Sequence, residues 1–346
     1  MKRLNEITII RPIVVLLCVV MHSFTIYNGA WPLPHTIHYV EAYAWIQRVT
    51  YSFMLETFVF ISGYVFAFRI YESGKRITLK DIIRKKTKRL IIPSFFFSIL
   101  NLLIFRFYSN GSNCMDLVYK IICGVGHMWF LPMLFLCFLF SYIILKLKLS
   151  QKGKLLLLFL VSAFSVIPFP FRISETMYYL LFFYLGIYIC RERECIKNKF
   201  ARKGYIIKLL CTFIITFVLG SFLRNELLSM CRFDINLVSK FFILASAKII
   251  MIIYSFIGTM TLYLTVVYFI KCGKKISTWV IRSNEISMGV YVIHHFLLQF
   301  LYYKTSVPSI LGTYWLPWIS CVAVLFLSIS TAILLRKTKI GRFLLG

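Results

Sequence analysis

Arg11 and His22 stand eleven positions apart in the first apolar segment of the chain, RPIVVLLCVVMH. In a helix, eleven steps of about 100° return almost to the same face, roughly 16 Å further along the axis. An arginine suits phosphate or carbonyl oxygens, and a histidine can take a proton from a hydroxyl at neutral pH. The pair therefore indicates acid–base chemistry beside an anionic donor. The alternative is that Arg11 extends to the membrane interface while His22 bonds a neighbouring helix.

Glu56 lies in the second apolar segment, at an expected depth similar to that of His22. A carboxylate there would orient the imidazole and stabilise its protonated form, in the manner of a catalytic triad. A structural pair with a basic neighbour is the alternative. Ser62 and Gly63 follow as a small pair that lets backbones approach closely, and we count them as candidate donor-binding residues or as plain helix packing.

Further candidates come later in the chain, in GHMWFLPM and ISMGVYVIHHF. His127 and Trp129 begin a span at the outer interface, where tryptophan is often only an aromatic-belt residue. Tyr291 and His294 lie near mid-span, so His294 is the more demanding to explain. We expect these four to support the site, and His294 is the alternative to Glu56 as the partner that orients His22, although a lone buried histidine is more often a packing residue.

A basic stretch, GKRITLKDIIRKKTKRLIIP, follows the second apolar segment. Its charges suit anionic lipid headgroups or the phosphates of a nucleotide-bearing donor. Arg89, next to the membrane near its end, is the best candidate for a specific contact, and Arg69 lies at the cytoplasmic end of the preceding apolar segment.

The composition indicates that these residues lie in a lipid bilayer. The 346 residues are 60% hydrophobic and 18% aromatic, against about 45–50% apolar in soluble domains. Crossing a bilayer takes roughly 20 apolar residues. The sequence therefore predicts an all-α polytopic membrane protein, one membrane domain over 1–346 with no fused extracytoplasmic domain. About ten transmembrane helices are expected, at about 9–29, 48–70, 90–108, 128–146, 155–170, 176–190, 206–223, 241–270, 284–303 and 314–335. The fifth and sixth are short, so they are tilted or form a re-entrant hairpin.

Charge gives the expected orientation. The net charge of +28 suggests nucleic acid in a soluble protein, but here most of the charge falls in loops. With the N-terminus inside, the inside segments hold 30 of the 40 Lys and Arg, which predicts N-in and C-in. We therefore expect a bilayer and no nucleic acid as partner. The ten cysteines show no metal or disulfide spacing, so no metal is expected.

Several of these stretches together resemble acyltransferase family 3, whose members modify cell-surface glycans and related acceptors. The resemblance covers most of the chain. It includes the Arg11–His22 spacing and then, in the family's order, FISGYVFAFR, KRLIIPSF, HMWFLPMLF, FFYLGIYI and ISMGVYVIHHF.

The resemblance implies transfer of an acyl group, acetyl by default, from cytoplasmic acyl-CoA to a hydroxyl of a surface or lipid-linked glycan. It implies a bacterial cytoplasmic membrane, with acyl-CoA as co-substrate. Arg11 and His22 carry over as the functional pair, and Arg69 and Arg89 loosely as donor residues. Glu56 departs from the family, since this chain reads MLETF where many members have a proline-containing MPLF-like stretch.

Two other functions remain open at this stage. A transporter of a polysaccharide intermediate would also place charges in a helical bundle, but it would more often show paired half-repeats. The other class of multispan acyltransferase uses a histidine in a late span, so His294 would outrank His22. The sequence does not identify the acyl group, the acceptor hydroxyl or the oligomeric state.

Overall fold

The structure is a computed structural model that describes residues 4–72, 78–105, 113–231, 233 and 236–345. These residues form helices and no strand, which confirms the all-α prediction. The helices are α1 (Asn5–Ser23), α2 (Glu41–Glu72), α3 (Leu79–Lys86), α4 (Ile92–Ile104), α5 (Cys114–Cys123), α6 (Phe130–Lys146), α7 (Gln151–Ala163), α8 (Ile173–Arg191), α9 (Arg193–Phe200), α10 (Lys203–Met230), α11 (Leu237–Lys271), α12 (Thr278–Tyr303), α13 (Val307–Lys337) and α14 (Lys339–Leu345). Short 3₁₀ turns η1 (Thr25–Asn28), η4 (Gly126–Trp129) and η5 (Phe164–Val166) join some of them, and η2 (Thr87–Ile91) is a π-helix.

Each of the ten expected spans overlaps a helix of the structure, and residues 106–108 of the span expected at 90–108 lie outside the described residues. Within the described residues, eight helical segments are long and apolar enough to cross a membrane. The other two expected spans are α7 and α12. With 13 residues, α7 extends only about 20 Å. With 26 residues, α12 is long enough, but its sequence is more polar. The chain is thus a polytopic membrane protein.

The chain clusters into two compact units. Unit 1 comprises Met1–Ile10, Leu55–Lys86 and Pro132–Lys275, and unit 2 comprises Arg11–Met54, Thr87–Leu131 and Ile276–Gly346. The helices α1 and α2 each contribute to both units. In α1 the boundary falls beside Pro12, which has no N–H to donate to the carbonyl of Thr8. Whether the chain is one domain, as the sequence suggests, stays a prediction.

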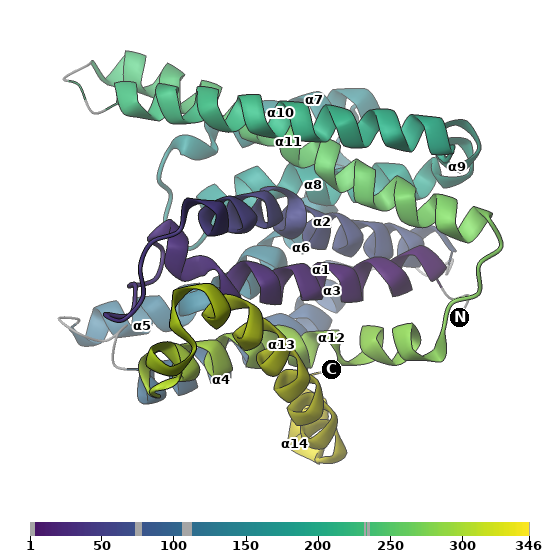
Figure 1. The fold of residues 1–346 in the computed structure, drawn as a ribbon. Coiled ribbons are helices and arrows are strands. Elements are labelled where there is room, and N and C mark those ends of the chain that lie inside the picture. Colours follow the sequence, from purple (N-terminus) through teal and green to yellow (C-terminus); the bar gives the residue numbers. More distant parts are fainter. Residues whose placement is uncertain (1–3, 73–77, 106–112, 232, 234–235, 346) are drawn as a thin grey trace. The chain divides into compact units, whose positions relative to one another are not determined.

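Two glycines let α2 and α8 cross closely in unit 1. A Cβ on Gly63 would lie 1.9 Å from the carbonyl oxygen of Phe183, and a Cβ on Gly186 would lie 2.0 Å from that of Phe60. Only glycines allow the backbones this near. The long helices α10 and α11 run side by side in the same unit (Figure 1).

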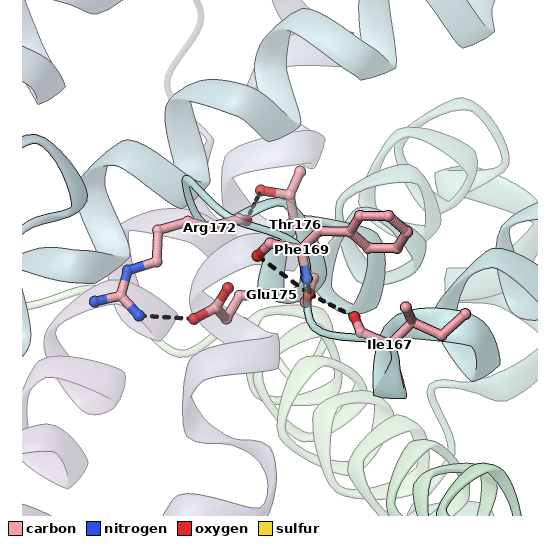
Figure 2. A network of polar contacts seen from close by, with 6 residues as sticks. Ile167, Phe169, Arg172, Glu175 and Thr176 are labelled. Carbon is pink, nitrogen blue, oxygen red and sulfur yellow. Dashed lines mark hydrogen bonds and ion pairs between the residues drawn. The ribbon is translucent and has the colours of Figure 1, made fainter. Parts of the chain in front are cut away.

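The short α7 returns to α8 through the turn PFPFRISE. Phe171 and Arg172 have φ of 55° and 63°, a left-handed conformation that reverses the chain before α8. Figure 2 shows Arg172 and Glu175 pointing toward one another, with 2.7 Å between guanidinium and carboxylate. Thr176 Oγ1 donates to the Arg172 carbonyl at 2.6 Å. The side chain of Ser174 donates to the carbonyl of Ile167 at 2.8 Å. These contacts give polar groups of the turn hydrogen-bond partners within the turn itself.

Unit 2 contains most of α1, the N-terminal part of α2, and α4, α12 and α13. The helix α12 begins where Ser277 accepts a hydrogen bond from the N–H of Val280, an N-cap. It packs closely on α13, because a Cβ on Gly289 would lie 2.6 Å from the Cβ of Ala332. Pro93 follows the π-helix η2 at the start of α4, and π-helical turns of this kind are frequent at functional sites.

Candidate functional site

Two side chains of α1 contact α12 within unit 2. Arg11 Nη1 donates to Asn284 Oδ1 at 3.0 Å. Eleven residues later His22 Nδ1 lies 3.1 Å from His294 Nε2. Arg11 and His22 therefore share one face of α1, as the spacing predicts. The two helices run in the same direction, because both partners are met in chain order: Asn284 lies beside Arg11, and His294, ten residues later, lies beside His22.

The hydrogen bonds of His294 determine where its proton lies. Its Nδ1 lies 2.9 Å from the Val290 carbonyl oxygen, which can only accept. In the neutral ring the proton is therefore on Nδ1, and Nε2 is an acceptor.

The same reasoning extends to His22. Its Nδ1 faces two acceptors, the Cys18 carbonyl at 2.9 Å and the Nε2 of His294 at 3.1 Å. The proton of neutral His22 is therefore on Nδ1, which leaves the lone pair on Nε2. Among the described residues, all hydrogen bonds of this ring are made by Nδ1, so Nε2 is the nitrogen open to a substrate.

Two further imidazoles complete a cluster of four of the six histidines in the chain. His127 and His295 stack with their ring centroids 4.1 Å apart, and His295 lies 5.2 Å from His22. The hydroxyl of Tyr291 donates to the His127 carbonyl at 2.6 Å, and His127 Nε2 lies 3.2 Å from the Val292 carbonyl. These contacts tie η4 to α12 inside unit 2.

Burial distinguishes His22 from the rest of the cluster. The side chains of His127, His294 and His295 are buried, whereas His22 is only half-buried. Trp31 lies beside it, with ring centroids 6.0 Å apart. His22 is therefore the member of the cluster that a ligand reaches.

Trp129 and Tyr291 support this cluster in different ways. Tyr291 belongs to it through its bond to His127. Trp129 is half-buried in η4 and packs edge-on against Phe130, with centroids 6.2 Å apart. Its predicted supporting role stays a prediction.

Glu56 belongs to a different polar centre, in unit 1. Tyr178 donates to its Oε1 at 2.8 Å and lies 3.5 Å from Ser255 Oγ. The ammonium of Lys248 lies over the Tyr178 ring, 4.5 Å from the centroid. Glu56 is buried, and its Oε2 has no hydrogen-bond partner among the described residues. The predicted orientation of His22 by Glu56 stays a prediction.

Ser62 and Gly63 have packing roles in the structure. Ser62 Oγ donates to the Phe58 carbonyl of its own helix at 2.9 Å, and Gly63 forms the α2–α8 crossing described above. These packing contacts explain both residues without a bound acyl donor. Their predicted role in binding the acyl donor stays a prediction.

Arg69 and Arg89 are both exposed. Arg69 lies in the last turn of α2 in unit 1, and Arg89 lies in the π-helix η2 of unit 2. Part of the basic stretch between them, residues 74–77, lies outside the described residues.

Three residues of the unit 2 site were missed in the sequence: Cys18, Asn284 and Trp31. Cys18 stands one helical turn before His22, a spacing that could have flagged it. Its Sγ lies 3.6 Å from His22 Nδ1 and 3.7 Å from His294 Nε2, and these atoms have the mutual spacing of metal ligands. No sequence spacing indicated this group, because His294 is 272 residues from His22.

A family model described as an acyltransferase domain matches residues 4–337, nearly the whole chain. The chain belongs to acyltransferase family 3. It is thus a membrane acyltransferase. Neither the curated proteins nor the solved structures compared with the chain include a match.

Proposed function

We propose that this family 3 acyltransferase moves an acyl group, acetyl by default, from cytoplasmic acyl-CoA to a hydroxyl of a cell-surface glycan or its lipid-linked precursor. The bacterial cytoplasmic membrane is its proposed location. One observation carries the proposal: within unit 2, α12 fixes both ends of the Arg11–His22 face, and the His22 ring keeps Nε2 as a lone pair.

His22 is the proposed general base. Its Nε2 takes the proton of the acceptor hydroxyl while that oxygen attacks the thioester carbonyl. The carbon–sulfur bond then breaks, and the imidazolium returns the proton to the leaving CoA thiolate. The products are the ester and CoA thiol, so protons and charge balance. General base catalysis of this kind contributes about 10²–10⁴-fold.

His294 is the proposed positioning residue for this base. When His22 is protonated, its Nδ1–H is held by the Cys18 carbonyl and His294 Nε2. Both acceptors stabilise the cation and fix the ring, the task of the carboxylate in a catalytic triad. The deeper burial of His294 and its engaged Nδ1 favour His22 over His294 as the base.

Arg11 is the proposed contact for phosphate or carbonyl oxygens of the donor arm, since its guanidinium offers several donors and one is given to Asn284. Arg69 and Arg89 are proposed to bind the phosphates of acyl-CoA from the cytoplasmic side. Charge reversal at either should weaken acyl-CoA binding more than acceptor binding.

The decisive experiment compares wild type, His22→Ala and His294→Ala in cells that carry the acceptor glycan. Surface glycan is analysed by mass spectrometry, and membrane insertion is checked by blotting. We expect the added acyl mass to disappear with His22→Ala. Full acylation by properly inserted His22→Ala would refute the base assignment, and loss only with His294→Ala would transfer it to His294. Glu56→Gln tests the predicted role of Glu56 in orienting His22. A lower rate of acyl transfer in the folded variant would support that role.

A further inference from the structure

Three possible metal ligands converge in unit 2, where the sequence indicated none. They are Cys18 Sγ, His22 Nδ1 and His294 Nε2, at mutual distances of 3.6, 3.7 and 3.1 Å. We propose that these atoms form a binding site for a thiophilic divalent ion, Zn²⁺ foremost, and that the bound ion switches off acyl transfer. The second half of this proposal rests on the function proposed above.

The distances agree with tetrahedral zinc. With Zn–N of about 2.0–2.1 Å and Zn–S of about 2.3 Å, ligand atoms in a tetrahedron are about 3.3 Å (N to N) and about 3.6 Å (N to S) apart. The three observed separations each fall within a few tenths of an ångström of these values. A fourth position remains for water or another small ligand, as in zinc sites with three protein ligands.

The surroundings also favour a metal. The Nδ1–H of His294 is donated to the Val290 carbonyl, which directs its Nε2 lone pair inward, as second-shell carbonyls do for zinc-bound histidines. Cys18 and His22 are one turn apart on α1, so a single helix presents two ligands. Two more buried imidazole nitrogens close by, His127 Nδ1 and His295 Nδ1, have no hydrogen-bond partner among the described residues.

Binding rearranges two protons. The thiol of Cys18 releases its proton to solvent and ligates as thiolate. The Nδ1 of His22 exchanges its proton for the metal, so the neutral ring now carries its proton on Nε2. That nitrogen is the proposed base, and once protonated it can no longer accept the proton of a hydroxyl. The metal thus converts His22 to the tautomer that cannot start the reaction.

The site is tested by metal titration of the purified full-length protein in detergent, without any activity measurement. Co²⁺ is the optical probe, because thiolate ligation gives a charge-transfer band and tetrahedral geometry gives strong visible bands, and Zn²⁺ is then added as competitor. Cys18→Ala removes the thiolate. Cys137→Ala, a buried thiol of unit 1 beside Met133, is the matched control.

We expect one Co²⁺ per chain with a thiolate band, displaced by Zn²⁺, in wild type and Cys137→Ala, and affinity lowered by more than about tenfold in Cys18→Ala. Absence of stoichiometric binding by folded wild type, or the same spectrum in Cys18→Ala, would overturn the site.

Acyl transfer is then measured with Zn²⁺ and after chelation, each variant relative to its own metal-free rate. Wild type should lose activity reversibly and Cys18→Ala should be insensitive. Equal zinc sensitivity in both would overturn the switch. If wild type transfers no acyl group under any condition, the proposed function fails while the titration still decides the site.

Discussion

The two nitrogens of His22 have separate tasks, and backbone carbonyls assign them. Cys18, one turn earlier on α1, supplies an acceptor at 2.9 Å, and Val290 fixes the ring of His294 in the same way. Both are contacts between residues four apart in one helix. Each tautomer is thus determined within a single helix. The contact between the two rings then lets His294 of α12 help to hold the ring of His22 on α1.

Replacement of His294 tests this chain of contacts. In His294→Ala the protonated His22 loses a hydrogen bond worth about 1.5–3 kcal/mol, so we expect kcat to fall roughly 10- to 100-fold while KM for acyl-CoA changes little. His294→Gln should recover part of kcat, because its Oε1 can accept the same Nδ1–H. Steady-state kinetics with His35→Ala, an exposed loop histidine, as control would measure this. Equal kcat in the Ala and Gln variants would contradict a positioning role.

Arg11 should act on donor binding rather than on the chemical step. Arg11→Ala removes charged hydrogen bonds worth about 1.5–3 kcal/mol each, so we expect KM for acyl-CoA to rise at least tenfold with kcat less affected. Arg11→Lys should lie between, since a lysine keeps the charge but loses the planar fork. Asn284→Ala is the matched control, because it removes the partner and keeps the guanidinium. A fall in kcat at unchanged KM would contradict the assignment.

At the level of single residues, the sequence predicted the face and spacing of Arg11 and His22, and it offered His294 only as an alternative to Glu56 for orienting the His22 ring. Helical periodicity is local, and it can be computed from eleven residues. The contact of His22 with His294 depends on how segments 272 residues apart pack, which no periodicity contains. Cys18 lay within reach of a local argument, yet a thiol in an apolar run is usually a small hydrophobe.

The α2–α8 crossing leaves no room for a side chain at its two glycines. Gly63→Ala and Gly186→Ala would each place a methyl group about 2 Å from a carbonyl oxygen, and overpacking of this kind costs about 1–3 kcal/mol. We expect a lower midpoint of thermal unfolding in detergent for both. Gly204→Ala is the control, because nothing lies within 4 Å of a Cβ there, and its midpoint should be unchanged or higher. An unchanged midpoint in Gly63→Ala would contradict the close crossing.

The helices themselves were predictable because hydrophobic length is a strong signal in membrane proteins. Their ends were less so: α2 begins at Glu41, seven residues before the expected start at 48, since its first turns are polar. The helix α12 shows the limit of composition. Polar residues, among them Asn284 and His294, lower the hydropathy of α12. These two side chains contact Arg11 and His22 of α1 inside unit 2.

For the whole molecule, the charge distribution predicts a single orientation with both ends inside. Three exposed cysteines outside the expected spans can report it, Cys114, Cys195 and Cys272. Cys195 and Cys272 lie in strongly basic segments, RERECIKNKFARKGYIIK and KCGKKISTWVIR, whereas Cys114 follows the third span. The positive-inside bias therefore places Cys195 and Cys272 on the cytoplasmic side and Cys114 outside.

Single-cysteine variants that retain one of these thiols make the orientation measurable. In sealed right-side-out vesicles, a membrane-impermeant maleimide should label the Cys114 variant at once and the Cys195 and Cys272 variants only after permeabilisation. Early labelling of Cys272 with protection of Cys114 would reverse the orientation. It would also place Arg11 at the outer end of α1, where cytoplasmic acyl-CoA has no access, so the donor assignment depends on this result. A mutation that moves basic residues from the inside loops should shift the labelling pattern, because those charges are the physical cause of the orientation.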